Sequence, residues 1–123
     1  MIVYLAAPVS APTIKGVREN IARAKRWLSY AKKRWPQWTI IAPWIVDLEM
    51  TLDEGLTEAD TRARGLVDCE NVARVCGKII LAGGVLKPGM TREVEACLLG
   101  GGNGAFREVV DLLHLGTEPP ELT

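Results

Sequence analysis

Histidine is almost absent from this chain of 123 residues, and neither sign of charge is in excess. The single histidine, His114, has no serine or cysteine beside it in the sequence, so a Ser-His-Asp triad is not expected. Fifteen basic and fifteen acidic side chains give a net charge of zero. That balance predicts no general affinity for nucleic acids or membranes.

Cysteine and long apolar runs are scarce as well. Cys69, Cys76 and Cys97 are odd in number and lack zinc-site spacing, so we expect three buried, reduced thiols in a cytoplasmic protein. No apolar run approaches the roughly 20 residues that cross a bilayer. The apolar segment 1–8 has neither a basic start nor a cleavage site, so neither a signal peptide nor a membrane contact is expected.

The composition that remains is that of an ordinary folded domain. Hydrophobic residues make up 48% of the chain, which argues against disorder. We expect one domain over 1–116 and an extended tail over 117–123, which holds two prolines. The charge is uneven, because residues 1–38 carry eight Lys or Arg and one acid, whereas 39–123 carry seven and fourteen.

Apolar runs and helical periodicity alternate along the chain. The runs 2–7, 38–42 and 78–82 are bounded by proline or glycine and predict buried strands. Helices are predicted over 14–35, 57–75 and 90–99, a last strand over 105–110, and over 44–57 a loop with at most one helical turn. The alternation predicts a three-layer, Rossmann-like (flavodoxin-like) α/β fold with a parallel sheet of four or five strands flanked by helices.

The segment after the third predicted strand is the most informative for chemistry. Ligands of such sheets bind beyond the carboxyl ends of the strands. Here a glycine-rich loop enters a helix at Gly89, where unpaired N–H groups favour an anion, and Lys87, Thr91 and Arg92 stand beside it. The pattern matches no nucleotide-binding fingerprint, so it also fits an ordinary tight turn.

Glu93 lies one turn into that predicted helix, at the edge of its apolar face. One interpretation is a first-turn acid that the helix dipole favours. The other is a carboxylate directed into a pocket, where it would serve as a nucleophile or a base.

Four short segments carry a family resemblance through their order and spacing: Tyr4–Pro8, Glu19–Ala24, Ile41–Pro43 and Gly89–Ala96. Together they resemble the small phage and bacterial branch of the nucleoside 2-deoxyribosyltransferases and their nucleoside 5′-monophosphate N-hydrolase relatives. The resemblance covers about residues 1–100. It implies a domain of that type over 1–116.

The resemblance also implies an activity, namely cleavage or transfer of the N-glycosidic bond of a (deoxy)nucleoside or nucleoside 5′-monophosphate. Glu93 would attack C1′, Tyr4 would lie beside that carboxylate, and Asp68 would help to protonate the departing base. No cofactor or metal is implied, and a homodimer or higher homo-oligomer is expected. The residues expected to bind the substrate are Ala7, Pro8, Ser10, Trp44, Lys87, Gly89, Met90 and Thr91.

The chain departs from the family pattern at two places. Gly77 follows Cys76 where relatives often have an aspartate, and Lys87-Pro88 stands where several have an acid or serine. A lysine suits a phosphate, which favours nucleotides. The departures also fit a catalytically degenerate module that senses a nucleotide. A third hypothesis, an adaptor that binds nucleic acid or protein through the basic helix, is favoured least, because that helix lacks interleaved aromatic residues.

Several other side chains have two interpretations. Trp44 could stack on a base or belong to the core. Ser10 and Asn20 could contact the substrate; the alternatives are that Ser10 stabilises a turn and that Asn20 is a surface residue of the helix. Four acids, Asp47, Glu49, Asp53 and Glu54, could bind a metal through oxygen, although a solvated loop is the usual reading of such spacing.

Overall fold

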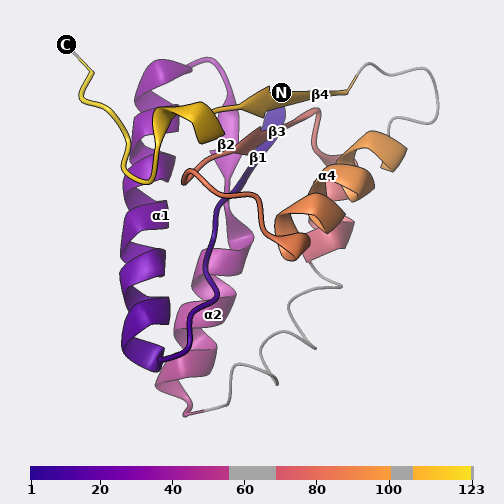
Figure 1. Ribbon diagram of the computed structural model, residues 1–123. Coiled ribbons are helices and arrows are strands. Elements are labelled where there is room, and N and C mark those ends of the chain that lie inside the picture. Colours follow the sequence, from indigo (N-terminus) through magenta and orange to yellow (C-terminus); the bar gives the residue numbers. More distant parts are fainter. Residues whose placement is uncertain (56–68, 101–106, 123) are drawn as a thin grey trace.

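Four parallel strands in the order β2-β1-β3-β4 lie at the centre of the protein (Figure 1). The computed structural model describes residues 1–55, 69–100 and 107–122. The strands are β1 (Ile2–Ala6), β2 (Thr39–Ile41), β3 (Lys78–Leu81) and β4 (Glu108–Asp111). Each pairing between neighbours is parallel, as the alternation of strands and helices predicts.

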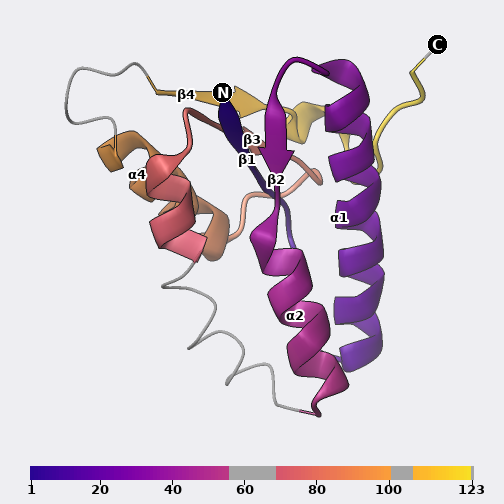
Figure 2. The same ribbon diagram turned by 180° about the vertical axis from the view of Figure 1, so that it is seen from behind.

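Helices cover both faces of this sheet. They are α1 (Ile14–Arg34), α2 (Pro43–Asp53), helical residues 69–75 and α4 (Pro88–Gly100), with a short 3-10 helix, η1, at Leu113–Leu115. From both sides of the molecule, α1 is seen on one side of the sheet, and α4 with residues 69–75 on the other (Figures 1 and 2). The predicted three-layer α/β fold is therefore confirmed. No helix in the described ranges is long and apolar enough to cross a lipid bilayer.

The apolar composition of β1 agrees with its position inside the sheet. Its residues Val3 to Ala6 have no exposed surface, since the strand pairs on both sides and helices cover both of its faces. Tyr4 lies opposite Ile41 of β2 and Ile79 of β3. A tyrosine in such an interior strand is unusual, because its hydroxyl requires a polar neighbour.

Helix α1 begins at the cap that its sequence offers. The Thr13 hydroxyl accepts a hydrogen bond from the Gly16 N–H at 3.0 Å. The helical periodicity of this segment predicts an apolar stripe made of Ile14, Val17, Ile21, Ala24, Leu28 and Ala31. The stripe packs into the core except at its first position, where Ile14 is 63% exposed. Trp27, outside that predicted stripe, is fully buried instead.

Helix α2 is longer than the predicted loop with one helical turn. Proline is favoured at the first position of a helix, and Pro43 occupies that position here. Trp44 and Ile45 are buried, and Leu48 and Leu52 pack against the same core at helical spacing. Interspersed acids concealed this periodicity in the sequence. The prediction over 44–57 was therefore wrong as far as Asp53.

Two other predicted elements fall partly outside the described residues. Of the helix predicted over 57–75, residues 69–75 are described and are helical. Of the strand predicted over 105–110, the described part forms β4, which continues to Asp111.

The basic side chains of α1 are largely engaged within the chain. The helix holds all eight Lys and Arg residues of the segment 1–38. Its contacts include ion pairs of Arg18 with Asp53, Lys25 with Glu49, and Arg23 and Arg26 with Glu118, and a hydrogen bond from Lys32 to the Ile40 carbonyl. This pairing lowers the positive charge that the helix offers to another molecule.

The strand order creates a crevice between β1 and β3. The chain leaves β1 toward β2 at one edge, then crosses back to β3 on the other side of β1. After β1 and β3 the chain continues to helices on opposite sides of the sheet, α1 and α4 (Figures 1 and 2), and ligand sites in open α/β sheets usually lie at such a point. Gly83, with φ of +97°, lets the two loops touch, since a Cβ there would lie 2.5 Å from Pro8 Cδ.

Candidate functional site

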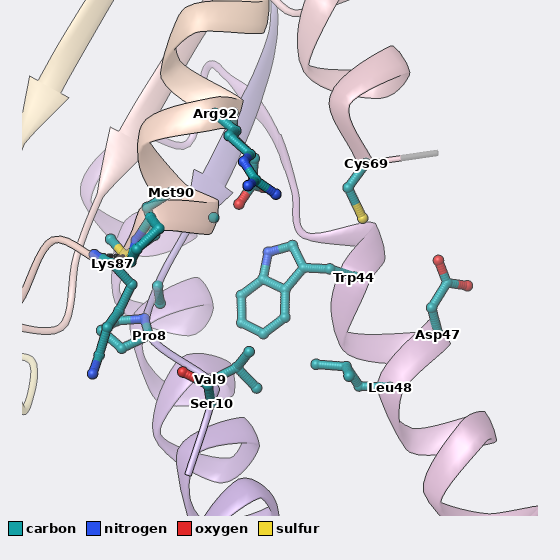
Figure 3. A pocket seen from close by; sticks show the side chains of 14 residues that line it. Pro8, Val9, Ser10, Trp44, Asp47, Leu48, Cys69, Lys87, Met90 and Arg92 are labelled. Carbon is teal, nitrogen blue, oxygen red and sulfur yellow. Dashed lines mark hydrogen bonds between the residues drawn. The ribbon is translucent and has the colours of Figure 1, made fainter. Parts of the chain in front are cut away.

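A pocket of about 270 Å³ opens at this crevice (Figure 3). Its volume is near the lower end of the range of about 300–1,000 Å³ typical of small-molecule sites. Four parts of the fold line it: the loop after β1, the first turns of α2, the start of the helical residues 69–75, and the loop and first turns of α4. The lining residues are Ala7, Pro8, Val9, Ser10, Trp44, Asp47, Leu48, Cys69, Lys87, Pro88, Gly89, Met90, Arg92 and Glu93.

The wall formed by the loop after β1 is held from α1. The Asn20 side-chain amide donates hydrogen bonds to the carbonyls of Val9 at 3.0 Å and Ser10 at 3.3 Å. Asn20 is not among the lining residues; it stabilises the loop, a role that neither of its two interpretations included. Ser10 does line the pocket.

The opposite wall is one face of α2. Trp44, Asp47 and Leu48 line the pocket together because they stand at helical spacings of three and four residues. The Trp44 indole N–H donates to the Leu5 carbonyl at 2.8 Å, and the side chain is 8% exposed. Trp44 is therefore both a core residue and a pocket residue, with its ring projecting toward the middle of the cavity (Figure 3).

Glu93 stands in the first turns of α4, with its carboxylate at the base of the pocket. Its Oε2 is buried and, among the described residues, has no hydrogen-bond partner of normal geometry. Burial raises the pKa of Glu93 to about 7, interaction with the Tyr4 hydroxyl lowers it, and the nearby charge of Glu70 raises it. A carboxyl with this pKa is divided between its two ionisation states near neutral pH.

Tyr4 lies under the pocket, in the centre of the sheet. Its hydroxyl is fully buried and, within the described part of the chain, also lacks a hydrogen bond of normal geometry. It is nevertheless close enough to Glu93 and Cys69 to interact with both. Burial, followed by these two neighbours, holds the pKa of Tyr4 far above its ordinary value, so the hydroxyl keeps its proton. A neutral donor thus faces a carboxyl acceptor.

The α4 side of the pocket lining carries two positive charges and a glycine. Lys87 and Arg92 both line it, on either side of the first turn of α4. A Cβ placed on Gly89 would have no described atom within 4 Å. Among the described residues, no contact therefore explains why this helical position is a glycine.

Most of the residues predicted to bind the substrate line the pocket, and one does not. Seven of the eight line the pocket; Thr91 does not, because it is exposed and its hydroxyl lies 3.5 Å from the Lys87 carbonyl. Sequence reasoning missed Val9, Leu48, Cys69 and the role of Asp47. The spacing of Asp47 and Leu48 from Trp44 was the available signal, had residues 44–53 been interpreted as a helix.

The metal hypothesis has no structural support. Within the described ranges, no group of three or more histidine, cysteine or acidic side chains is arranged to hold a metal ion. Glu49 and Asp53 form ion pairs with α1 instead. Asp68, the predicted proton donor to the leaving base, lies outside the described residues.

The geometry therefore combines a buried carboxyl with a pKa near neutrality, a neutral hydroxyl close to it, an indole ring, a second carboxyl and two cations in the lining. Such a set can bind an anionic, aromatic small molecule and offer a nucleophile or a base to it. Comparisons of the chain with protein-family models, with curated proteins and with solved structures find no match.

Proposed function

We propose that this pocket binds a nucleoside 5′-monophosphate or (deoxy)nucleoside and that Glu93 cleaves or transfers its N-glycosidic bond. The observation that carries the proposal is the position of the Glu93 carboxylate, buried and with an unsatisfied oxygen, in the pocket at the sheet's switch point. The resemblance of Tyr4–Pro8 and Gly89–Ala96 to the deoxyribosyltransferase and N-hydrolase superfamily supports the same chemistry.

The proposed reaction has two steps. The ionised Glu93 carboxylate attacks C1′, the C1′–N bond breaks with its electron pair moving to the base, and the base leaves after protonation. Water or a second base then displaces Glu93 from C1′ and restores the carboxylate. Desolvation makes the carboxylate more reactive, and the neutral Tyr4 hydroxyl lies close enough to interact with it.

The pocket also suggests how a substrate would lie. The Trp44 ring offers a stacking surface for the base, an interaction worth about 1–3 kcal/mol in single-strand binders. Lys87 and Arg92 offer charge to a 5′-phosphate, and Asp47 is the second carboxyl among the lining residues. This placement favours nucleotides over free nucleosides. Homo-oligomerisation and the proton-donor role of Asp68 stay predictions.

The test of the function is covalent trapping followed by product analysis. Wild-type protein incubated with a panel of ribo- and deoxyribonucleoside monophosphates is expected to release free base. A 2-deoxy-2-fluoro nucleotide should leave a glycosyl adduct on Glu93, because fluorine destabilises the oxocarbenium-like transition state that both steps share. Intact mass and peptide mapping would locate it. Nucleotide binding without any base release would show a catalytically degenerate binding module. Base release without a glycosyl adduct would reject Glu93 as the nucleophile.

Lys87 is expected to separate nucleotides from nucleosides. Lys87→Met keeps the length of the side chain but removes the charge, so KM for a monophosphate should rise roughly tenfold or more, with little change for the matching nucleoside. Steady-state kinetics with both substrates would measure this, with Lys15→Met, an exposed lysine of α1, as the control. Equal effects on both substrates would place the phosphate elsewhere.

A further inference from the structure

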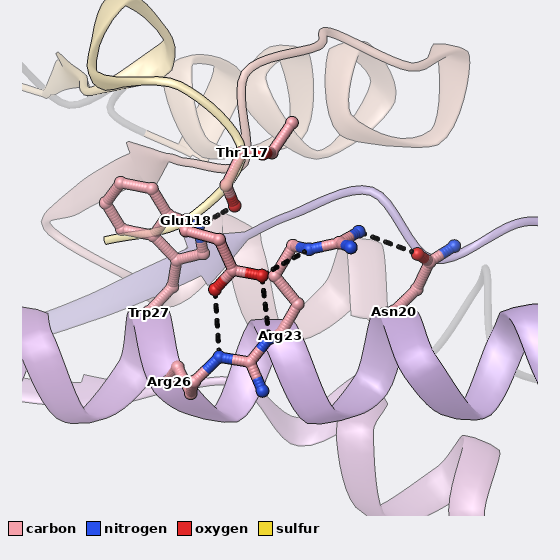
Figure 4. A network of polar contacts seen from close by, with 6 residues as sticks. All are labelled: Asn20, Arg23, Arg26, Trp27, Thr117 and Glu118. Atoms are coloured by element: carbon pink, nitrogen blue, oxygen red, sulfur yellow. Dashed lines mark hydrogen bonds and ion pairs between the residues drawn. The ribbon is translucent and has the colours of Figure 1, made fainter. Parts of the chain in front are cut away.

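The segment after η1 folds back over α1 and makes a polar network there (Figure 4). Glu118 Oε1 accepts a hydrogen bond from Arg23 Nε at 3.0 Å, and both of its oxygens accept from Arg26, at 2.7 and 2.9 Å. The Trp27 indole N–H donates to the Thr117 carbonyl at 2.8 Å. Exposed ion pairs are usually weak, but one carboxylate held by two guanidinium groups is a favourable exception.

This network continues to the pocket. Arg23 Nη1 donates to Asn20 Oδ1 at 3.1 Å, and the Asn20 amide donates in turn to the Val9 and Ser10 carbonyls. One guanidinium therefore connects the acid of segment 116–118 with the side chain that holds the pocket wall. Arg26 also binds Glu118 but has no described contact with Asn20. Of these two arginines, only Arg23 therefore connects Glu118 with Asn20.

The same segment also touches the second pocket loop. A Cβ on Gly84, which has φ of +82°, would lie 3.0 Å from the Gly116 carbonyl carbon and 3.1 Å from the Thr117 nitrogen. Gly84 begins the loop that leads to Lys87 and α4. Segment 116–118 therefore contacts the loop after β3 directly and the loop after β1 through Arg23 and Asn20.

We propose that segment 116–118 is a brace for the pocket and that Glu118, Arg23 and Asn20 are positioning residues that hold the Pro8–Ser10 wall in place. The network acts as a relay: Glu118 orients Arg23, Arg23 orients the Asn20 amide, and Asn20 fixes the two loop carbonyls. Arg26 and Arg23 hold the pKa of Glu118 down to about 2, so its charge persists at physiological pH. This bracing role is independent of the proposed function, because it holds the pocket wall whatever ligand the pocket takes.

Hydrogen exchange of the ligand-free protein tests this relay without relying on activity. Asn20→Ala should raise amide exchange in peptides covering residues 7–13 roughly tenfold, and Glu118→Gln roughly threefold, because each loosens the same two carbonyl anchors. Arg26→Ala should have a smaller effect, since Arg23 keeps Glu118. Glu121→Gln, an exposed acid three residues further on, is the matched control. Peptides covering α4 should not change.

Two further variants separate a relay from general loosening. Arg23→Lys keeps a charge for Glu118, but an ammonium lacks the fork that reaches Asn20 as well, so residues 7–13 should exchange faster while 117–122 stay protected. Adding Glu118→Gln to Asn20→Ala should cause no further increase in 7–13. Additive effects, or equal exchange in Glu118→Gln and Glu121→Gln, would overturn the proposal.

Discussion

Glu93→Gln is expected to reduce base release roughly a thousandfold or more, because an amide cannot form the glycosyl ester through which both steps of the reaction pass. The substitution keeps the shape of the side chain, so substrate binding should change far less than kcat. Glu95→Gln, an exposed acid two residues along the same helix, is the control and should retain wild-type turnover. Chromatography of the released base would measure both variants.

The pH dependence of the wild type distinguishes a nucleophile from an acid. The pKa of Glu93 is about 7, and only the ionised form can attack C1′. The value of kcat/KM should therefore rise with pH up to about 7 and then level off. If Glu93 donated a proton instead, kcat/KM would fall across the same range. Such a fall, or equal turnover by Glu93→Gln and wild type, would contradict the mechanism.

Glu93→Gln is also expected to stabilise the folded protein above neutral pH. Burial raises the pKa of Glu93 from 4.5 to about 7, so the folded state holds a proton that the unfolded state has already released. Wild-type stability should therefore fall as pH rises from about 4.5 to about 7. At about 1.4 kcal/mol for each pKa unit, the loss is up to about 3 kcal/mol, and Glu93→Gln removes it.

Urea unfolding at two pH values would measure this effect. At about pH 8, Glu93→Gln should exceed wild type in free energy of unfolding by up to about 3 kcal/mol, while at about pH 4 the two proteins should be nearly equal. Glu95→Gln should follow wild type at both values, since Glu95 is exposed. A variant less stable than wild type at pH 8 would mean that the carboxylate is satisfied in the folded state. A gain in stability with a loss of turnover is the pattern expected of a functional residue in a strained environment.

Much of the layered fold could be read from local patterns. The apolar runs at β1, β2 and β3 and the stripe along α1 mark buried elements, because burial on two faces, or on one helical face, imposes those patterns on a sequence. Helix α2 was missed because its apolar residues share a short segment with four acids and follow a proline. Pro43 was nevertheless a sequence signal for this helix, because proline is favoured at the first helical position.

Some residues of the site are neighbours in the sequence, whereas others are brought together only by the tertiary fold. Glu93, Lys87 and Gly89 stand in one short segment, so their proximity follows from helix geometry. Asp47, Cys69 and the Asn20 amide come from three separate elements. Their proximity to Glu93, or to the wall of its pocket, depends on strand order and helix packing, which no local pattern contains.

By itself, the sequence determined that this chain with one histidine and balanced charge would form a parallel α/β sheet with a glutamate beside a glycine-rich turn. Local periodicity and turn chemistry are sufficient for that. Only the tertiary structure decided that this glutamate is desolvated to a pKa of about 7, and that Glu118 of the segment after η1 connects through Arg23 to the pocket wall. The physical reason is that desolvation and ion pairing depend on distances between residues far apart in the chain.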